Sequence, residues 1–321
     1  MYDEIQAREL VVRAGLELVQ QGLVARTWGN VSARISDTEF IITPSGMAYD
    51  SLRVEDLVKV KISDCSYEGE IKPSSEKGVH AAVYAMRKDA HFVIHTHQFF
   101  ASALAADEQD MDFAPCAKYG LPGTSALKNN LIKSIEAHPD KKKFLMAKHG
   151  ALIIGETFNE AFDLSKELES ECKAIFLKKI PSLDSFKTDV AKIDELKTEE
   201  NPYVIVVKND YINECCQAGI TVKPYIDDFA QIVGPNAFVV KNSRKKIIAA
   251  LKNRNAVLVK GIGAICTGKT MDDAEAVSMI VSKNCAAACY VRKAGPMSFI
   301  DARLQRYIYL KKYSKLKDSK K

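Results

Sequence analysis

The most informative stretches of this chain are Lys72-Pro-Ser-Ser-Glu76 and Val93-Ile-His-Thr-His97. The second stretch belongs to a predicted β-strand over residues 91–97. Side chains alternate between the two faces of a strand, so His95 and His97 point to the same face. Two adjacent imidazoles with a carboxylate upstream indicate a divalent-metal site, because histidine nitrogen binds zinc at about 2.0–2.1 Å.

The composition is that of a globular protein. The chain has 321 residues, of which 47% are hydrophobic and 27% charged, enough for one large domain or two ordinary ones. No apolar run approaches the ~20 residues of a membrane-spanning helix, and the acidic, amphipathic N-terminus does not resemble a signal peptide. We therefore expect a cytoplasmic protein with no membrane partner.

The positive net charge lies at the C-terminus. The chain carries a formal net charge of +5, and residues 311–321 hold six lysines and one aspartate, which alone give +5. The rest of the chain is therefore neutral and offers no basic surface to a nucleic acid. We expect residues 311–321 to form a solvated basic tail. The eight cysteines lack C-x-x-C spacing and are predicted to be reduced thiols.

Hydrophobic periodicity predicts a series of helices and strands in the first half of the chain. Thr157 followed by Glu160 is a capping-box pattern, which predicts the start of a long helix. Residues 181–201 are charged and lack an apolar stripe, which predicts a linker. The predicted helices are 3–22, 76–87, 99–106, 125–136 and 158–178, and the predicted strands are 39–43, 57–62, 91–97, 144–148 and 151–154.

The second half of the chain repeats part of the first. Residues 203–208 align with 92–97 at an offset of 111, and residues 258–274 align with 145–161 at an offset of 113. In both copies a pair of strands is followed by glycine, threonine and a capped helix. Two matches at nearly one offset indicate an internal repeat, so residues 202–310 are predicted to be a degenerate partial copy.

The alignment of the two copies adds a third histidine to the predicted site. Where the first copy has three histidines, the second copy has unrelated side chains. Joint loss is what a copy without a metal site would show, so the three histidines are predicted to bind one ion. The aligned pairs are His95 with Val206, His97 with Lys208, and His149 with Ile262.

Five short motifs in the first 180 residues resemble those of the class II aldolase/adducin family in their order and separation. The family resemblance implies an α/β/α sandwich around a mixed, largely antiparallel sheet, formed here by residues 1–180. The motifs are Gly29-Asn-Val-Ser32, Thr43-Pro-Ser-Gly46, Pro73-Ser-Ser-Glu76, His95-Thr-His97 and His149-Gly150.

The resemblance also implies roles for individual residues. It implies a Zn²⁺ ion, or another divalent metal such as Mn²⁺, held by His95, His97, His149 and Glu76. It implies that Glu76 also acts as general acid and base. Turn N–H groups and short hydroxyls suit a phosphate dianion, and the implied phosphate contacts are Gly29, Asn30, Ser45, Gly46, Ser74 and Ser75.

The reaction that the resemblance implies is the cleavage of a small ketose phosphate to dihydroxyacetone phosphate and an aldehyde, through a metal-stabilised enediolate. Two alternatives of the same fold are a sugar-phosphate 4-epimerase and a dehydratase. A further alternative is a non-catalytic, adducin-like interaction domain, which would have lost the histidines. Family members are commonly cyclic tetramers, so a homo-oligomer is expected.

Three features fall outside this interpretation. Only 17 residues separate His97 from Pro115, whereas family aldolases carry there a longer segment with a tyrosine that reaches the aldehyde end of a neighbouring subunit's site. Tyr119 lies in a different context and does not inherit that role. Residues 263–270 match the spacing of a phosphate-binding loop, but the aligned first copy predicts a strand and a helix there. His80 fits no motif, and the sequence assigns it only to the surface or to packing.

Overall fold

The structure is a computed structural model, and the residues that it describes are 1–24, 28–180, 189–192 and 196–313. They form two compact units, Met1–Lys173 (unit 1) and Ala174–Lys321 (unit 2). The boundary lies inside a long helix, a few residues before the end that the sequence predicts for the first domain. Each unit has its own β-sheet.

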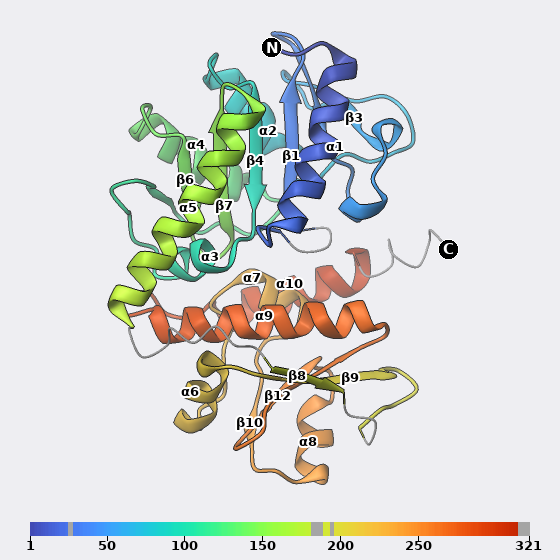
Figure 1. Cartoon of the computed structure of the whole chain (residues 1–321), viewed down its shortest axis with the longest axis vertical. Helices are drawn as coiled ribbons and strands as arrows, with labels where there is room; N and C mark the ends of the chain where they lie inside the picture. The colour runs from blue at the N-terminus through green and yellow to red at the C-terminus, as the bar shows by residue number, and fades with distance from the viewer. Residues whose placement is uncertain (25–27, 181–188, 193–195, 314–321) are drawn as a thin grey trace. The chain divides into compact units, whose positions relative to one another are not determined.

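Unit 1 contains a seven-stranded sheet in the order β3-β2-β1-β4-β7-β6-β5. All neighbouring strands are antiparallel except β5 and β6, which are parallel. Strand β4 therefore lies in the middle of the sheet, between β1 and β7 (Figure 1). The strands are β1 Asn30–Arg34, β2 Glu39–Ile42, β3 Val58–Lys61, β4 Phe92–Thr96, β5 Cys116–Ala117, β6 Lys143–Met146 and β7 Gly150–Gly155.

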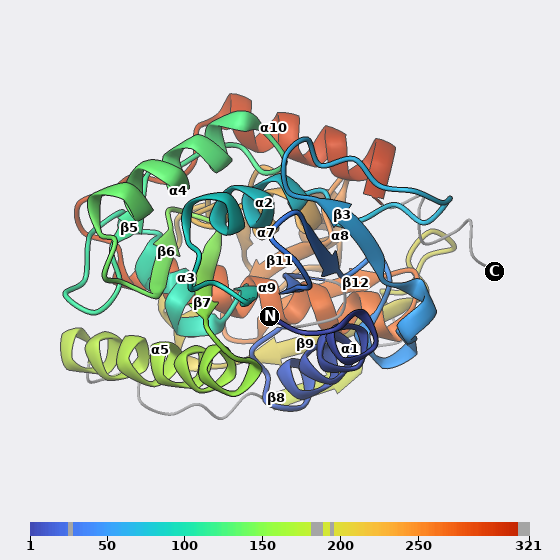
Figure 2. The ribbon, with the colours of Figure 1, turned by 90° about the horizontal axis from the view of Figure 1, so that it is seen from above.

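Helices cover both faces of this sheet, which confirms the α/β/α sandwich. Helices α2 and α4 lie on one face, and α1 and α5 lie on the other (Figure 2). Neighbouring side chains of β4 separate the two layers: Val93 belongs to the core beneath α2 and α4, whereas the Phe92 ring packs edge-on against Phe158 of α5. The helices are α1 Glu4–Gln20, α2 Lys77–Met86, α3 Phe99–Ala105, α4 Ser125–Ala137 and α5 Phe158–Lys179, with short 3-10 turns at Tyr49–Ser51 and Val54–Asp56.

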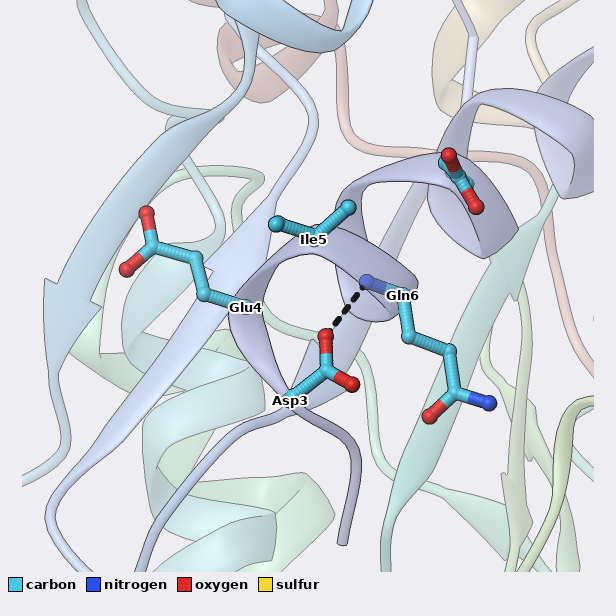
Figure 3. Close-up of a pocket in the computed structure, with 5 residues that line it drawn as sticks. Asp3, Glu4, Ile5 and Gln6 are labelled. Atoms are coloured by element: carbon cyan, nitrogen blue, oxygen red, sulfur yellow. Dashed lines mark hydrogen bonds between the residues drawn. The ribbon is translucent and has the colours of Figure 1, made fainter.

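Side-chain hydrogen bonds mark the starts of two of the predicted helices. Asp3 caps α1, because its Oδ1 accepts the backbone N–H of Gln6 at 2.8 Å (Figure 3). Thr157 caps α5, and its hydroxyl accepts the N–H of Glu160 at 3.2 Å. Each bond satisfies a backbone donor that the first helical turn would otherwise leave without a partner.

Strand β1 is an element for which the sequence makes no strand prediction. Its residues Asn30-Val-Ser-Ala-Arg34 are all buried, so polar and apolar side chains face protein on both sides. The usual alternation between apolar and polar residues is therefore missing. The strand is central nonetheless, because it pairs with β2 on one side and with β4 on the other.

Unit 2 contains a five-stranded sheet in the order β10-β11-β12-β9-β8. Strand β8, Asp189–Lys192, lies within the segment that the sequence predicts as a linker, and its pairing with β9 corrects that prediction. Four residues with a charge at each end give no apolar pattern, so only the pairing identifies the strand. Residues 181–188 and 193–195 of the predicted linker lie outside the described residues. The other strands are β9 Tyr203–Lys208, β10 Val239–Val240, β11 Ala256–Val259 and β12 Gly263–Gly268.

The remaining elements of unit 2 include helices α6 to α10 and a last helical turn. The predicted basic tail begins inside the last helical turn, Tyr309–Tyr313, and residues 314–321 lie outside the described residues. Residues 263–268 form strand β12 and not a phosphate-binding loop. The helices are α6 Asp210–Ala218, α7 Asp227–Ile232, α8 Arg244–Leu251, α9 Met271–Tyr290 and α10 Phe299–Ile308.

The central strands of the two sheets have the same register at the offsets that align the two sequences. Phe92 pairs with Gly155 in unit 1, and Tyr203 pairs with Gly268 in unit 2. The adjoining antiparallel pair and the parallel pair beyond it also correspond, with β11 and β10 in the places of β6 and β5. The two sheets therefore share four strands of one topology.

Among the described residues, no helix combines the length and the apolar composition that crossing a membrane requires.

Candidate metal centre

Three histidine rings meet at one end of the central strands of unit 1. His95 lies in β4, His97 directly follows it, and His149 lies in the turn between β6 and β7. The three ring centroids are 4.8 Å from one another in every pair. Each ring offers a nitrogen, and these nitrogens all lie within 4.8 Å of one another. The structure thus brings together the three histidines that the sequence selects.

Glu76 completes this group from the start of α2. Its Oε1 lies 3.0 Å from Nε2 of His149, and its Oε2 lies 3.2 Å from Nε2 of His95. Glu76 occupies the N-cap position of α2 but its side chain makes no capping hydrogen bond, so the carboxylate is directed into the site. The side-chain amide of Asn30 donates to Oε2 at 3.0 Å.

The hydrogen bond behind His95 determines which of its nitrogens faces the site. The carbonyl of Ala151 can only accept, so His95 donates to it through Nδ1, at 2.9 Å. The lone pair of Nε2 then points toward Glu76 and toward Nε2 of His97, 3.0 Å away. Nitrogen lone pairs that converge on a carboxylate are the arrangement that a bound cation stabilises.

The separations also fit a single ion. Ligands at about 2.0–2.1 Å from a tetrahedral zinc lie roughly 3.3 Å apart. The nitrogen of His95 lies 3.0 Å from that of His97 and 3.2 Å from a carboxylate oxygen of Glu76. The residues present therefore fit a divalent metal with imidazole and carboxylate ligands.

Two members of the ligand set, His95 and Glu76, are in the protonation state that binds metals. Burial lowers the pKa of His95 to about 3, so its ring is neutral near pH 7. Burial opposes the ionisation of Glu76, but the two imidazoles beside it and the Asn30 amide outweigh that effect and hold the pKa of its carboxyl well below the usual value. A neutral His95 beside an ionised Glu76 carboxylate matches what a divalent cation requires.

Two glycines allow the neighbouring strands to approach the histidine strand. A Cβ atom at Gly29 would lie 2.4 Å from the carbonyl oxygen of His95, and one at Gly150 would lie 2.2 Å from that of Thr96. Both distances are shorter than side chains tolerate. Gly29 also has a φ of +77°, which a residue with a side chain rarely adopts. Close packing of the strands beside the site therefore explains why glycine occupies these two motif positions.

The predicted phosphate-binding stretches lie next to each other. The N–H of Ser74 donates to the carbonyl of Thr43 at 3.0 Å, and that of Ser45 donates to the carbonyl of Lys72 at 2.9 Å. The hydroxyl of Ser74 accepts the N–H of Glu76 at 3.2 Å. The two stretches are thus tied together directly before the catalytic candidate.

The remaining predicted contacts lie at different degrees of exposure. Ser45 is half-buried and Gly46 is exposed. Ser75 is exposed and lines a cavity of about 260 Å³ together with Glu76 and with Lys77 and Lys128 from the starts of α2 and α4. Asn30 is buried, and its amide nitrogen is bonded to the carboxylate of Glu76. The phosphate contacts themselves stay a prediction.

His80 is a residue beside the site that the motifs do not reveal. It is fully buried in α2, its Nε2 is hydrogen-bonded to Oδ1 of Asn30, and its Nδ1 lies 2.6 Å from the hydroxyl of Ser32. A sequence signal exists, because Glu76, His80 and Tyr84 recur every four residues and so share one helix face. The sequence does not show what that face meets.

Comparison with known proteins establishes the family. A family model described as the class II aldolase and adducin N-terminal domain matches residues 9–176, just over half of the chain. The chain therefore belongs to the class II aldolase and adducin family.

Individual relatives match about half of the chain. A 3-oxo-tetronate 4-phosphate decarboxylase of Pectobacterium atrosepticum is 30% identical over 190 residues, 54% of this chain and 85% of the relative. An L-fuculose phosphate aldolase of Haemophilus influenzae is 31% identical over 171 residues, 50% of this chain and 77% of the relative. A solved structure of an L-fuculose 1-phosphate aldolase is 28% identical, with a TM-score of 0.50, and the match covers 54% of this chain and 86% of that one.

The relatives differ in the reaction that they carry out. They include aldolases, a decarboxylase and also a ribulose-phosphate 4-epimerase. Their names share a phosphorylated sugar or sugar acid. The family membership therefore does not select one reaction for this chain.

Proposed function

We propose that this protein is a divalent-metal-dependent lyase that cleaves a small ketose phosphate to dihydroxyacetone phosphate and an aldehyde. The observation that carries the proposal is the convergence of three imidazoles on the carboxylate of Glu76. The aldolases among the relatives support the choice of reaction. The retained histidines support a metal-dependent enzyme over a non-catalytic domain of the same family.

In this proposal His95, His97 and His149 hold the ion, with Zn²⁺ as the first expectation and Mn²⁺ as the alternative. When bound, the ion supplies Lewis-acid stabilisation of the negative charge that develops on the substrate oxygens. The donation from His95 Nδ1 to the Ala151 carbonyl fixes that ring and keeps Nε2 available as a ligand.

Glu76 is the proposed proton carrier. It removes the proton from the substrate hydroxyl, the carbon–carbon bond breaks, and the aldehyde carbonyl forms from that oxygen. The electron pair of the broken bond is left on the ketose fragment, and the protonated Glu76 then delivers the proton to its carbon. The position of the carboxylate at the start of α2, 10% exposed, keeps water largely away from this step.

The phosphate group is proposed to bind where the two serine-containing stretches meet. The backbone N–H of Gly46 and the hydroxyls of Ser45 and Ser75 are the proposed donors, with Gly29, Asn30 and Ser74 completing the set. The start of α2 adds the positive end of a helix dipole, which favours an anion.

The second candidate is the decarboxylation of a 3-oxo acid phosphate. The relative with that activity is 30% identical over 85% of its own length, which favours this alternative specifically. The carbon–carbon bond that breaks then releases carbon dioxide in place of an aldehyde, and the same charge remains on the sugar fragment. The lack of a tyrosine matching the aldehyde end of family aldolases is consistent with this candidate.

One experiment separates the candidates. The purified chain, loaded with Zn²⁺ or Mn²⁺, is incubated with a panel of ketose 1-phosphates and with 3-oxo-tetronate 4-phosphate, and dihydroxyacetone phosphate and carbon dioxide are measured. We expect dihydroxyacetone phosphate from at least one ketose phosphate. Carbon dioxide alone would establish the decarboxylase, and neither product with bound metal would overturn both. His138→Gln is the matched histidine control and should leave turnover unchanged.

A further inference from the structure

A chain of buried hydrogen bonds leads from the core of unit 1 to the carboxylate of Glu76. The hydroxyl of Tyr84 lies 2.7 Å from that of Ser32, which lies 2.6 Å from Nδ1 of His80. Nε2 of His80 bonds Oδ1 of Asn30, whose Nδ2 donates to Oε2 of Glu76 at 3.0 Å. The four side chains behind Glu76 are each at most 5% exposed.

This row of hydrogen bonds forms because residues of helix α2 and strand β1 are spaced by similar distances where the two elements pack. Glu76, His80 and Tyr84 are spaced by four residues, so each step along α2 is about 6 Å. Asn30 and Ser32 are spaced by two residues on β1, a step of about 6.6 Å on one face of the strand. Polar groups of α2 and β1 therefore alternate along the contact between helix and sheet.

The chemistry of the groups fixes the direction of every hydrogen bond. The carboxylate of Glu76 can only accept, so the Asn30 atom that contacts it is the amide nitrogen. Oδ1 of Asn30 is then an acceptor and needs a donor, which is Nε2–H of His80. Nδ1 of a neutral His80 accepts from the Ser32 hydroxyl, and that oxygen accepts from Tyr84. All donors thus point toward Glu76.

We propose that His80 is a positioning residue, which holds the side-chain amide of Asn30 in the orientation that directs its N–H at Glu76. Without the His80 bond the Asn30 amide can rotate and turn its Oδ1 toward Glu76. Both groups are then acceptors, and the Glu76 carboxylate repels Oδ1. Ser32 and Tyr84 in turn hold His80 as the tautomer with the proton on Nε2. The inference rests on the proposed function only for what Glu76 does, and not for how it is held.

The burial of His80 agrees with this role. Burial lowers the pKa of His80 to about 4, so the ring is neutral at pH 7 and Nδ1 remains an acceptor. A protonated ring would donate from both nitrogens and would reverse the bond to Ser32. The neutral ring is the only form of His80 that allows every hydrogen bond from Tyr84 to Glu76 to donate toward Glu76.

Two substitutions of His80 test the proposal against a merely structural role. His80→Gln reaches as far as Nε2 and keeps an N–H for Asn30, whereas His80→Asn is shorter and keeps only the contact with Ser32. We expect H80N to lower kcat by about 10–100-fold with little change in KM, and H80Q to recover most of that loss. Equal kcat values for two folded variants would overturn the proposal, as would a loss of thermal stability in both without a difference in kcat.

A measurement without substrate separates this proposal from the proposed function. In ¹⁵N NMR spectra of the chain labelled at histidine, the signal that disappears in H80Q should show a proton on Nε2 and a free lone pair on Nδ1. A proton on Nδ1 would overturn the proposal even in an active enzyme. If His80 shows the Nε2–H tautomer but the protein turns over no sugar phosphate, the positioning proposal stands and the proposed function is wrong. If H80N does not fold, the His80 tautomer measured in the unmodified protein tests the proposal instead.

Discussion

The sheets of the two units have corresponding strands with one register but different residues at the same places. In unit 1 the position beside Leu152 is His95, and in unit 2 the equivalent position beside Ile265 is Val206. Val206 belongs to an apolar cluster that also contains Val259. The strand arrangement therefore does not require histidine, so the histidines of unit 1 need another explanation.

The comparison extends to the strand beside the histidines. In unit 1 the neighbour of β4 is β1, and Asn30 lies opposite His95. In unit 2 the neighbour of β9 is β8, and Ala191 lies opposite Val206. Alanine therefore stands in unit 2 at the register position where unit 1 has Asn30. Within the corresponding strands, the units differ in their polar groups and not in the strand register.

The largest effect should come from giving unit 1 the residue of unit 2. His95→Val removes one ligand and the ring that contacts Glu76, so we expect loss of the metal and a fall in kcat/KM of roughly a thousandfold or more. Metal analysis and turnover of the same preparation measure both. Full activity in metal-loaded H95V would show that the comparison has no bearing on function.

A smaller loss is expected when the ligands stay and only the proton carrier changes. Glu76→Gln keeps the size of the side chain and removes its basicity, so kcat should fall by about 100–10 000-fold. The chain should still bind the metal through its histidines, although less tightly. A kcat within tenfold of the unmodified chain would assign the proton transfer to another group.

The reciprocal change tests unit 2. Val206→His places an imidazole in an apolar cluster without a partner, which should lower the free energy of unfolding by about 1–3 kcal/mol. Urea denaturation measures this change. Lys208→His is the matched control, because that position is exposed and should change the stability by less than about 0.5 kcal/mol. A stable V206H chain that gains a second metal ion would contradict the proposed loss of function in unit 2.

The last prediction concerns the dependence of stability on pH. The pKa of His80 is about 4 in the folded chain and about 6.5 when unfolded, so the unfolded state binds the extra proton between these values. The stability that neutral His80 contributes is complete above pH 6.5 and is lost as the pH falls toward 4, by about 1.4 kcal/mol for each pH unit. Urea midpoints at pH 7 and pH 5 should therefore differ more in the unmodified chain than in H80Q. An unchanged difference would mean that His80 is not buried as described.

Much of the site is predictable from the sequence because its parts are local. The alternation of a strand places His95 and His97 on one face, and the helix pattern after Ser75 places Glu76 at a helix start. Both follow from backbone geometry over a few residues. The aligned second half supplies His149, which no local pattern would have selected.

The rest depends on contacts between distant segments. Ser32 and His80 are 48 residues apart, and a helix pattern cannot show which strand it packs against. Strand β8 has four residues and no apolar stripe, so its existence depends on pairing with β9. These features arise from tertiary packing, which overrides weak local preferences.

The most direct test is the metal content of the full chain, measured before and after chelation together with the melting temperature. We predict about one divalent ion per chain, its loss in H95V but not in V206H, and a lower melting temperature after chelation because the ion binds only the folded state. A chain that binds no divalent ion, and whose melting temperature does not respond to chelator, would contradict a metal centre at His95, His97 and His149.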